Sequence, residues 1–379
     1  MPRKSLARAR RLVVKVGTGT LTDAAGRFDR ENCARLAAEL ARAAEGRRLV
    51  LVTSGAVALG AERLGLVRTK GRPWDIATKQ ACAAVGQPHL MAAWGEALGA
   101  RGREVAQVLL TADDLASRKR FLNARRTFHQ LLERGVVPVV NENDTVAVDE
   151  IKVGDNDTLA GLVASCVEAD LVAMLTDVEG LYDRDPREKG AALLHDVERV
   201  TAELERIAGG AGTERSTGGM ATKVKAARRL AAQGVVTALL SGRRPGALAG
   251  LLDGERIGTV FAASAERLSA RDGWLHAAAR GKGLILVDAG ARKAITEKGK
   301  SLLPSGVKGV HGSFGVGDPV EIAVDAARPF ARGLAGYAAD DVRRLAGKKT
   351  SEIEGTLGFR YTDEVVHRND LVLLEDPVV

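Results

Sequence analysis

Short apolar runs alternate with longer amphipathic segments through the first two thirds of the chain. The runs are rich in β-branched residues and have the length of buried strands, whereas the segments between them are rich in Ala, Leu and Arg. Strands that alternate with helices predict a mainly parallel sheet covered by helices, a fold of the α/β class. The strand-like runs are RLVVKVG (11–17), RLVLVTSG (48–55), EVAQVLL (104–110), GVVPVVN (135–141), DLVAMLTD (170–177) and GVVTALLSG (234–242).

Helical periodicity is clear just after the acidic stretch NENDTVAVDEIKVGDND (141–157). Apolar side chains recur there at i, i+3, i+4, i+7 and i+8, which predicts a helix that begins near Thr158 and buries one face. Cys166 belongs to this stripe and is therefore interpreted as a packing residue. The stripe consists of Leu159, Leu162, Val163, Cys166 and Val167.

The pattern changes beyond residue 262. The helical segments thin out, and short runs such as GLILVDAG, DPVEIAV and DLVLLED are separated by turns that contain Gly and Pro. This predicts two domains: a larger one over residues 1–262 and a small β-rich one over residues 282–379, joined by a linker over residues 263–281.

Composition agrees with a two-domain globular protein, since 379 residues of which 45% are hydrophobic can form more than one core. No apolar run approaches the roughly 18 residues that span a bilayer, and the basic N-terminal segment contains only a five-residue apolar stretch, so we expect a cytoplasmic protein. Cys33, Cys82 and Cys166 are far apart and form no CxxC, which favours small core residues over a disulfide or a thiolate metal site.

The net charge of +8 raises the possibility of a nucleic-acid partner. Residues 277–379 hold 15 Lys and Arg against 14 Asp and Glu, so the predicted second domain is close to neutral. Aromatic residues make up only 3% of the chain, which disfavours a surface that stacks on single-stranded bases. An anionic small substrate explains the excess of positive charge at least as well.

Two glycine turns that carry a lysine are candidates for phosphate binding. The first strand ends in Lys15 and the turn GTGT (17–20), where a cation precedes exposed backbone N–H groups. A second segment, STGGMATK (216–223), opens a helical pattern and would place Lys223 beside the positive end of a helix dipole. Taken alone, each is also consistent with an ordinary glycine turn or helix start.

Polar residues follow other predicted strands as well, and ligands of open parallel sheets bind beyond these carboxyl ends. Helix capping is the alternative for Ser54 and Asp157, and a turn or strand end is the alternative for Asp144 and Asp177. Several such clusters at successive strand ends are more than capping alone explains.

Other chemistries lack their motifs. The chain contains no GxxxxGK[ST], no GxGxxG after a strand and no HExxH, and none of its six histidines neighbours a candidate nucleophile. The acidic stretch lacks the D-x-D-x-D-G spacing of an EF-hand. Phosphoryl transfer is the reaction class that remains.

Seven segments spread over the larger domain are similar to those of the amino-acid kinase family, and within it to the glutamate 5-kinases. Residues 283–374 resemble a PUA domain, the small β-barrel that many bacterial glutamate kinases carry. The kinase-like segments are VVKVGTGTL, VTSGAVALG, KQACAAVGQ, RFLNARRTF, PVVNENDTVAVDEIKVGDND, the segment from Met174 to Pro186 and TGGMATK.

The resemblance implies an αβα sandwich, the amino-acid kinase fold, in which ATP and glutamate bind along the carboxyl ends of the strands. Mg2+ would be held mainly through the ATP phosphates, with no protein ligand assigned to it. Lys15 and Lys223 would stabilise the transferring phosphoryl group, and Asp157 would orient both lysines. The family often has Gly at Ser216 and Ser where this chain has Thr18 and Thr20. The implied ATP-binding residues are Lys15, Thr176, Asp177, Thr217, Gly218, Gly219, Met220, Ala221, Thr222 and Lys223, and the implied glutamate-binding residues are Ser54, Asp144 and Asn156.

The implied reaction moves the γ-phosphoryl group of ATP to the side-chain carboxylate of glutamate, the first step of proline biosynthesis. The resemblance also implies feedback inhibition by proline, a homo-oligomer (dimer or tetramer) and a separate glutamyl phosphate reductase, because no aldehyde-dehydrogenase-like region follows the kinase segment. Two alternatives stay open: a kinase for aspartate, acetylglutamate, carbamate or a nucleoside monophosphate, and an RNA-binding or regulatory protein, since PUA domains elsewhere often bind RNA. The near-neutral tail disfavours RNA binding.

Overall fold

The computed structural model describes residues 3–23, 25–66, 74–147, 156–209, 219–263, 274–275, 281–326 and 328–374. The chain divides into two compact units, of which the first comprises Met1–Leu115 and Lys119–Leu268 and the second comprises Ala116–Arg118 and Ser269–Val379. Most of the predicted linker lies outside the described residues, so the boundaries of the two domains stay a prediction.

Among the described residues, the first unit contains an eight-stranded sheet in the order β3-β4-β2-β1-β5-β7-β8-β6. Each of the six runs predicted from the sequence contains a strand, and these six strands are parallel to one another. Strand β8, which is antiparallel to β7, makes the sheet mixed. The predicted mainly parallel sheet is confirmed. The strands are β1 (Arg11–Val16), β2 (Arg48–Thr53), β3 (Val105–Leu110), β4 (Val137–Glu142), β5 (Leu171–Thr176), β6 (Asp196–Val197), β7 (Val236–Ser241) and β8 (Thr259–Phe261).

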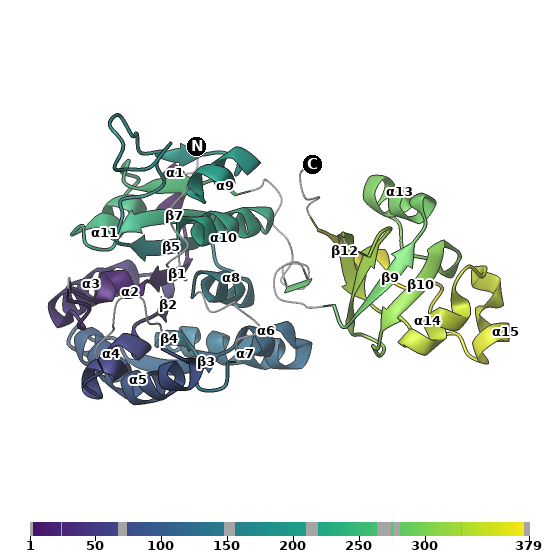
Figure 1. Cartoon of the computed structure of the whole chain (residues 1–379), viewed down its shortest axis with the longest axis horizontal. Helices are drawn as coiled ribbons and strands as arrows, with labels where there is room; N and C mark the ends of the chain where they lie inside the picture. Colours follow the sequence, from purple (N-terminus) through teal and green to yellow (C-terminus); the bar gives the residue numbers. More distant parts are fainter. Residues whose placement is uncertain are drawn as a thin grey trace. The chain divides into compact units, whose positions relative to one another are not determined.

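Helices cover both faces of this sheet, with α3 and α11 on one face and α8 and α10 on the other (Figure 1). Side chains of a strand alternate between the faces. Leu12, Val14 and Val16 of β1 therefore pack into the core that includes α3, α5 and α11, whereas Lys15 faces α8. These helices are α3 (Arg30–Ala43), α5 (Ile76–Gly99), α8 (Asn156–Val167), α10 (Met220–Ala232) and α11 (Ala247–Leu252). The other helices described in the first 263 residues are α1 (Arg3–Leu6), α2 (Thr18–Leu21), α4 (Ala56–Arg63), α6 (Ala112–Ala116), α7 (Arg118–Glu133) and α9 (Ala202–Ala208).

Helices α4 and α5 meet at two glycines. A Cβ atom at Gly60 would lie 1.8 Å from the carbonyl oxygen of Cys82, and a Cβ atom at Gly86 would lie 1.9 Å from the carbonyl oxygen of Ala56. Neither distance leaves room for a side chain, so the two helix backbones touch directly. This contact positions the segment KQACAAVGQ beside the sheet.

Helix α8 begins at Asn156, two residues before the start predicted from the apolar stripe. The stripe itself is buried, as predicted, because it faces the sheet. Cys33, Cys82 and Cys166 are all free and buried, and burial raises the pKa of the Cys33 and Cys166 thiols to about 12. The prediction that the cysteines are packing residues is confirmed.

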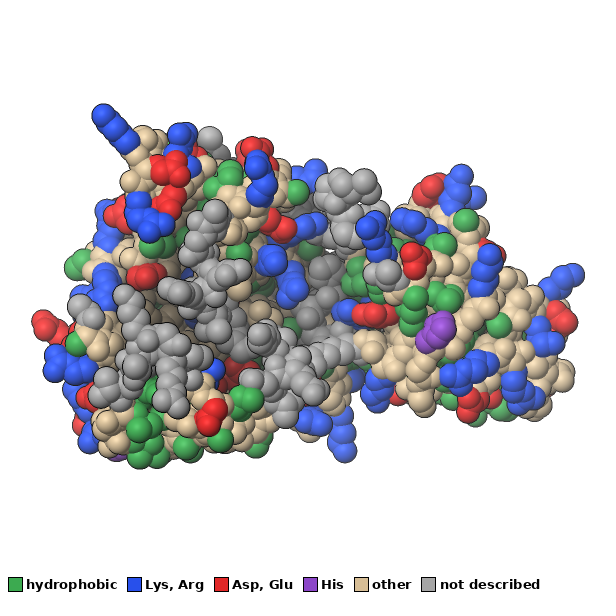
Figure 2. Space-filling view, viewed as in Figure 1, with side chains coloured by type: hydrophobic (Ala, Val, Ile, Leu, Met, Phe, Trp, Pro, Cys, Tyr) green, Lys and Arg blue, Asp and Glu red, His purple; other side chains and the backbone are tan. Residues whose placement is uncertain are grey.

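The second unit contains a mixed five-stranded sheet in the order β10-β9-β11-β12-β13 among its described residues. Strands β9 and β11 are parallel, and the other neighbouring pairs are antiparallel. On the face seen in Figure 2, its Lys and Arg side chains are interspersed with Asp and Glu. The elements are β9 (Gly283–Val287), α13 (Ala289–Lys298), η1 (Pro304–Gly306), β10 (Val307–Gly312), β11 (Pro319–Ala323), β12 (Pro329–Leu334), α14 (Ala339–Leu345), η2 (Thr350–Glu352), α15 (Ile353–Leu357), η3 (Arg368–Asp370) and β13 (Leu371–Leu373). Within the part of the chain that the structure describes, no helix is both long and apolar enough to cross a bilayer.

Candidate active site

Strand β1 lies between β2 and β5, and this position places Lys15 at the middle of the sheet. Lys15 is the last residue but one of β1, with Val52 of β2 and Met174 of β5 as its neighbours in register. Its side chain is 5% exposed and points to the start of α8. Lys15, at the carboxyl end of the central strand β1, therefore contacts α8, the helix that contains the last residues of the acidic stretch.

The carboxylate of Asp157 lies between two lysine ammonium groups. Its Oδ1 is 2.6 Å from Nζ of Lys15, and its Oδ2 accepts a hydrogen bond from Nζ of Lys223 at 3.0 Å. The hydroxyl of Thr222 is 3.2 Å from the same Oδ2. The structure thus brings together Lys15, Asp157 and Lys223, which lie far apart in the sequence. Their formal charges sum to +1, which suits a site that receives an anion.

Burial and charge act in opposite directions on Asp157. The side chain is fully buried, and loss of hydration opposes its ionisation, but the nearby ammonium groups of Lys15 and Lys223 outweigh this and hold its pKa below the ordinary value. Asp157 is therefore ionised at neutral pH and holds both lysine side chains in fixed positions.

Amide and hydroxyl side chains form a second cluster beside this ion pair. Asn156, at the first position of α8, donates from Nδ2 to Ser54 Oγ at 2.7 Å and lies 3.2 Å from Asn141 Oδ1. Asn141 donates to Gln87 Oε1 at 2.9 Å, and Gln87 donates to Gln107 at 3.2 Å. Each amide thus donates to the next one along the series from Asn156 through Asn141 and Gln87 to Gln107. As a result, the buried Oδ1 of Asn156 has no hydrogen-bond partner among the described residues and remains an acceptor.

Asp144 follows β4 in a turn. Burial raises its pKa to about 6, since desolvation penalises the charged form. No described residue forms a hydrogen bond or an ion pair with its side chain. The part of the acidic stretch from 148 to 155 lies outside the described residues, including most of the loop between Asp144 and Asn156.

The turn after β1 approaches the end of β5. A Cβ atom at Gly17 would lie 3.4 Å from Nζ of Lys15, and one at Gly19 would lie 3.6 Å from Oδ2 of Asp177. Thr176 ends β5 and donates from Oγ1 to Asp177 Oδ1 at 2.9 Å. Two segments separated by more than 150 residues therefore line the same edge of the sheet, as the carboxyl ends of parallel strands must.

Helix α10 supplies the second lysine. It begins at Met220 after Gly219, whose extended backbone forms the N-cap without a side-chain hydrogen bond. Lys223 is in the first turn and is 6% exposed at its side chain. Of the residues implied for ATP binding in this segment, Gly219 to Lys223 are described, whereas Thr217 and Gly218 lie outside the described residues.

Comparison with known families identifies both parts of the chain. The model of the amino acid kinase family matches residues 10–240. The chain belongs to the amino acid kinase family. A model of the PUA domain matches residues 283–357 of this amino acid kinase.

Curated relatives match this amino acid kinase over nearly its whole length. A glutamate 5-kinase of Anaeromyxobacter dehalogenans (strain 2CP-C) is 77% identical over 375 residues, covering 99% of either chain. A glutamate 5-kinase of Myxococcus xanthus (strain DK1622) is 54% identical over 373 residues, covering 98% of either chain. One of Syntrophotalea carbinolica (strain DSM 2380 / NBRC 103641 / GraBd1) is 48% identical over 381 residues, covering 98% of this chain and all of the relative.

Two polar residues of the site were not singled out from the sequence. Asn141 is 2% exposed and Gln87 is 8% exposed, and both orient Asn156 through the chain of amides. Each stood within a segment that carries the family resemblance, but nothing in the spacing of residues indicates that α5 and β4 meet at these side chains. The sequence-based alternative that Ser54 caps α4 does not hold, because the N-cap residue is Gly55 and the Ser54 hydroxyl accepts from Asn156.

Proposed function

We propose that this chain transfers the γ-phosphoryl group of ATP to the side-chain carboxylate of L-glutamate, giving L-glutamyl 5-phosphate and ADP. The observation that carries the proposal is the buried carboxylate of Asp157 shared by Lys15 and Lys223, beside a cluster of amide and hydroxyl groups. The names of the curated relatives support the choice of glutamate.

The nucleophile in this reaction needs no general base. A glutamate side chain has a pKa of about 4.3 and is ionised near pH 7. The difficulty is electrostatic, because an anion attacks the γ-phosphorus while negative charge spreads over the equatorial oxygens of the transferring group. The carboxylate oxygen forms a bond to phosphorus as the bond to the β,γ-bridging oxygen breaks, and ADP leaves with the electron pair. Lys15 and Lys223 stabilise this charge, with Asp157 fixing where their ammonium groups lie.

Mg2+ is proposed to reach the site with ATP. Within the described part of the chain, no group of three or more His, Cys, Asp and Glu side chains is placed to hold a metal ion. Mg2+ keeps water and phosphate oxygens as ligands and requires few from protein. The ion would offset the charge of the β- and γ-phosphates, next to Thr176, Asp177 and the segment from Thr217 to Lys223, which are proposed to bind the nucleotide.

Glutamate is proposed to bind at Ser54, Asp144 and Asn156. Both amide hydrogens of Asn156 are directed to Ser54 and Asn141, so Asn156 presents its oxygen. This oxygen and the carboxylate of Asp144 suit the α-ammonium group, whereas the Ser54 hydroxyl, which accepts from Asn156, has its own hydrogen free to donate to the α-carboxylate.

The test is formation of an acyl phosphate. ADP production is measured with hydroxylamine present to trap the product as a hydroxamate, using glutamate, aspartate and N-acetylglutamate in parallel. We expect turnover with glutamate, and a kcat about 10²- to 10³-fold lower in Lys223→Ala. Turnover with only one of the other two acids would refute glutamate as the substrate but leave the kinase assignment intact.

The remaining partners are proposed from the resemblance. The partners are a separate glutamyl phosphate reductase that consumes the labile product, and proline as a feedback inhibitor. A homo-oligomeric assembly and a cytoplasmic location are proposed on the same ground. RNA binding by the second unit is the alternative, because PUA domains elsewhere often bind RNA, but the near-neutral charge of that unit disfavours it. In a filter-binding assay of the full chain across salt concentrations, tight binding with a steep salt dependence would support RNA binding.

A further inference from the structure

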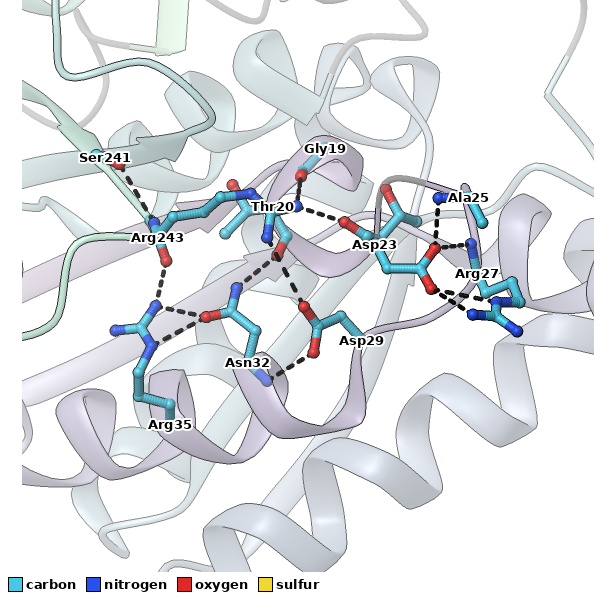
Figure 3. A network of polar contacts seen from close by, with 12 residues as sticks. Gly19, Thr20, Asp23, Ala25, Arg27, Asp29, Asn32, Arg35, Ser241 and Arg243 are labelled. Atoms are coloured by element: carbon cyan, nitrogen blue, oxygen red, sulfur yellow. Dashed lines mark hydrogen bonds and ion pairs between the residues drawn. The ribbon is translucent and has the colours of Figure 1, made fainter.

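Two side chains hold the backbone of the turn that follows β1. Arg243 donates from Nη2 to the carbonyl oxygens of Gly19 at 2.9 Å and of Thr22 at 2.5 Å. Asn32 of α3 donates from Nδ2 to the carbonyl oxygen of Thr20 at 2.6 Å. Figure 3 shows Arg243 and Asn32 reaching the carbonyl groups of Gly19 and Thr20 from separate elements. Three carbonyl groups within four residues thus accept hydrogen bonds from side chains.

Arg35 sets the direction of the Asn32 amide. Its Nε and Nη2 donate to Asn32 Oδ1 at 2.9 and 2.6 Å, and an amide whose oxygen is occupied on one side must present its NH2 group on the other. Arg35 also donates to the carbonyl oxygen of Gly242, next to Arg243 in sequence. The two arginines therefore connect α3, the turn and the loop after β7 into one network, which we call the turn clamp (Asn32, Arg35 and Arg243).

The loop after β7 packs closely on the turn at Gly242. A Cβ atom there would lie 2.4 Å from Cγ2 of Thr20, so no larger residue fits without displacing the turn. The backbone N–H of Gly242 donates to the carbonyl oxygen of Thr176 at 2.7 Å. The clamp is thereby anchored to the end of β5, where Thr176 and Asp177 lie.

The clamped turn presents two backbone N–H groups. No residue among those described accepts a hydrogen bond from the N–H of Thr18 or Gly19. The carbonyl groups of the same two peptide units are held, since Gly17 O accepts from Thr20 N at 3.0 Å and Thr18 O accepts from Thr22 Oγ1 at 3.0 Å. The C=O and N–H of a trans peptide point in opposite directions, so both N–H groups are directed away from these bonds.

We propose that the turn clamp positions the nucleotide for phosphoryl transfer, by holding the turn Gly17–Leu21 so that its free N–H groups and the ammonium group of Lys15 meet the phosphates of ATP together. The inference rests on the proposed function for the identity of the phosphate donor. Arg243, Asn32 and Arg35 act as positioning residues: they hold the backbone and do not themselves bind the substrate.

The experiment compares Arg243→Ala with Arg244→Ala, a matched control that removes the same charge from the same loop. The backbone N–H of Arg244 bonds within the loop, and no described residue bonds to its side chain. Misplacing a reacting group by about 1 Å can lower the rate of a reaction roughly 100-fold. We therefore expect Arg243→Ala to lower kcat/KM for ATP about 10- to 100-fold, mainly through a higher KM for ATP, while the KM for glutamate changes less than about twofold. Arg244→Ala should leave both unchanged.

Two further variants separate geometry from charge and from folding. Arg243→Lys keeps the charge but loses the planar fork, so it should recover only part of the ATP affinity. Asn32→Asp keeps the shape and the bond to Arg35 but removes the donor to Thr20, and should raise the KM for ATP in the same selective way. Equal rises in both KM values together with a lower Tm would indicate a merely structural role and overturn the proposal.

Affinity for a non-hydrolysable ATP analogue, measured by calorimetry without glutamate, distinguishes a failure of the proposed function from a failure of the turn-clamp proposal. Wild-type protein that binds the analogue but does not phosphorylate glutamate would refute the proposed function alone. Analogue affinity that is unchanged in Arg243→Ala would overturn the turn clamp alone, and wild-type protein that binds no ATP analogue would overturn both.

Discussion

Replacing Asp157 by asparagine removes the carboxylate that the ammonium groups of Lys15 and Lys223 both contact, at 2.6 and 3.0 Å. At an effective dielectric constant of about 20, each attraction amounts to about 6 kcal/mol before desolvation offsets part of it. Removing one partner of a buried ion pair costs about 3–5 kcal/mol in net stability, because the remaining charges stay buried. We expect Asp157→Asn to lower the free energy of unfolding by this amount at pH 7.

The assay is urea denaturation of the wild type, of Asp157→Asn and of Asp177→Asn, a matched control in which the same chemical change is made at an exposed side chain. The control should lie within about 0.5 kcal/mol of the wild type. Because the folded-state pKa of Asp157 is lowered, its contribution is present above its unfolded pKa of about 3.9 and is lost as the pH falls through the folded value. A variant within about 1 kcal/mol of wild type at pH 7 would refute the reasoning.

Three more outcomes are expected. Lys223→Ala should lower kcat about 10²- to 10³-fold at saturating ATP, and a near-wild-type kcat would contradict its role in stabilising the transferring phosphoryl group. Because burial raises the pKa of Asp144 to about 6, its carboxylate is protonated below that pH, and the KM for glutamate should rise about tenfold from pH 7 to pH 5; Asp144→Asn should have a high KM without this pH dependence. Gly60→Ala should destabilise the fold by about 3 kcal/mol, because its Cβ would lie 1.8 Å from Cys82 O. The control Gly99→Ala, which has open space around it, should be neutral or slightly stabilising, and equal effects of the two variants in urea denaturation would disprove the close packing of α4 on α5.

The elements of the larger unit could largely be predicted from the sequence. Buried parallel strands need short continuous apolar runs, and the runs that contain β1 and β5 stand out for that reason. The helix over Asn156–Val167 was recognisable because its apolar stripe has to face the sheet. The stripe predicts a start two residues after the observed one, since Asn156 and Asp157 are polar and contribute nothing to it.

The candidate site was predictable as a set of residues but not as a set of contacts. Gly turns with a lysine and polar residues at strand ends marked Lys15 and Lys223, and the family resemblance indicated the others. That Asp157 pairs with both lysines depends on α8 and α10 lying on the same face of the sheet as the Lys15 side chain. The orientation of Asn156 depends on Asn141 and Gln87, which no periodicity links to it.

Local structure can be read from the sequence, because strand and helix periods, glycine turns and cap residues act over a few residues. Which of these elements are neighbours depends instead on how the whole chain packs. The strand order sets β1 between β2 and β5, and the loop after β7 against the turn after β1, so that Arg243 reaches Gly19 across 224 positions of sequence. Such contacts are set by packing of the whole sheet and its helices, and a hydrogen bond from a side chain to a distant carbonyl leaves no pattern in the sequence around either partner.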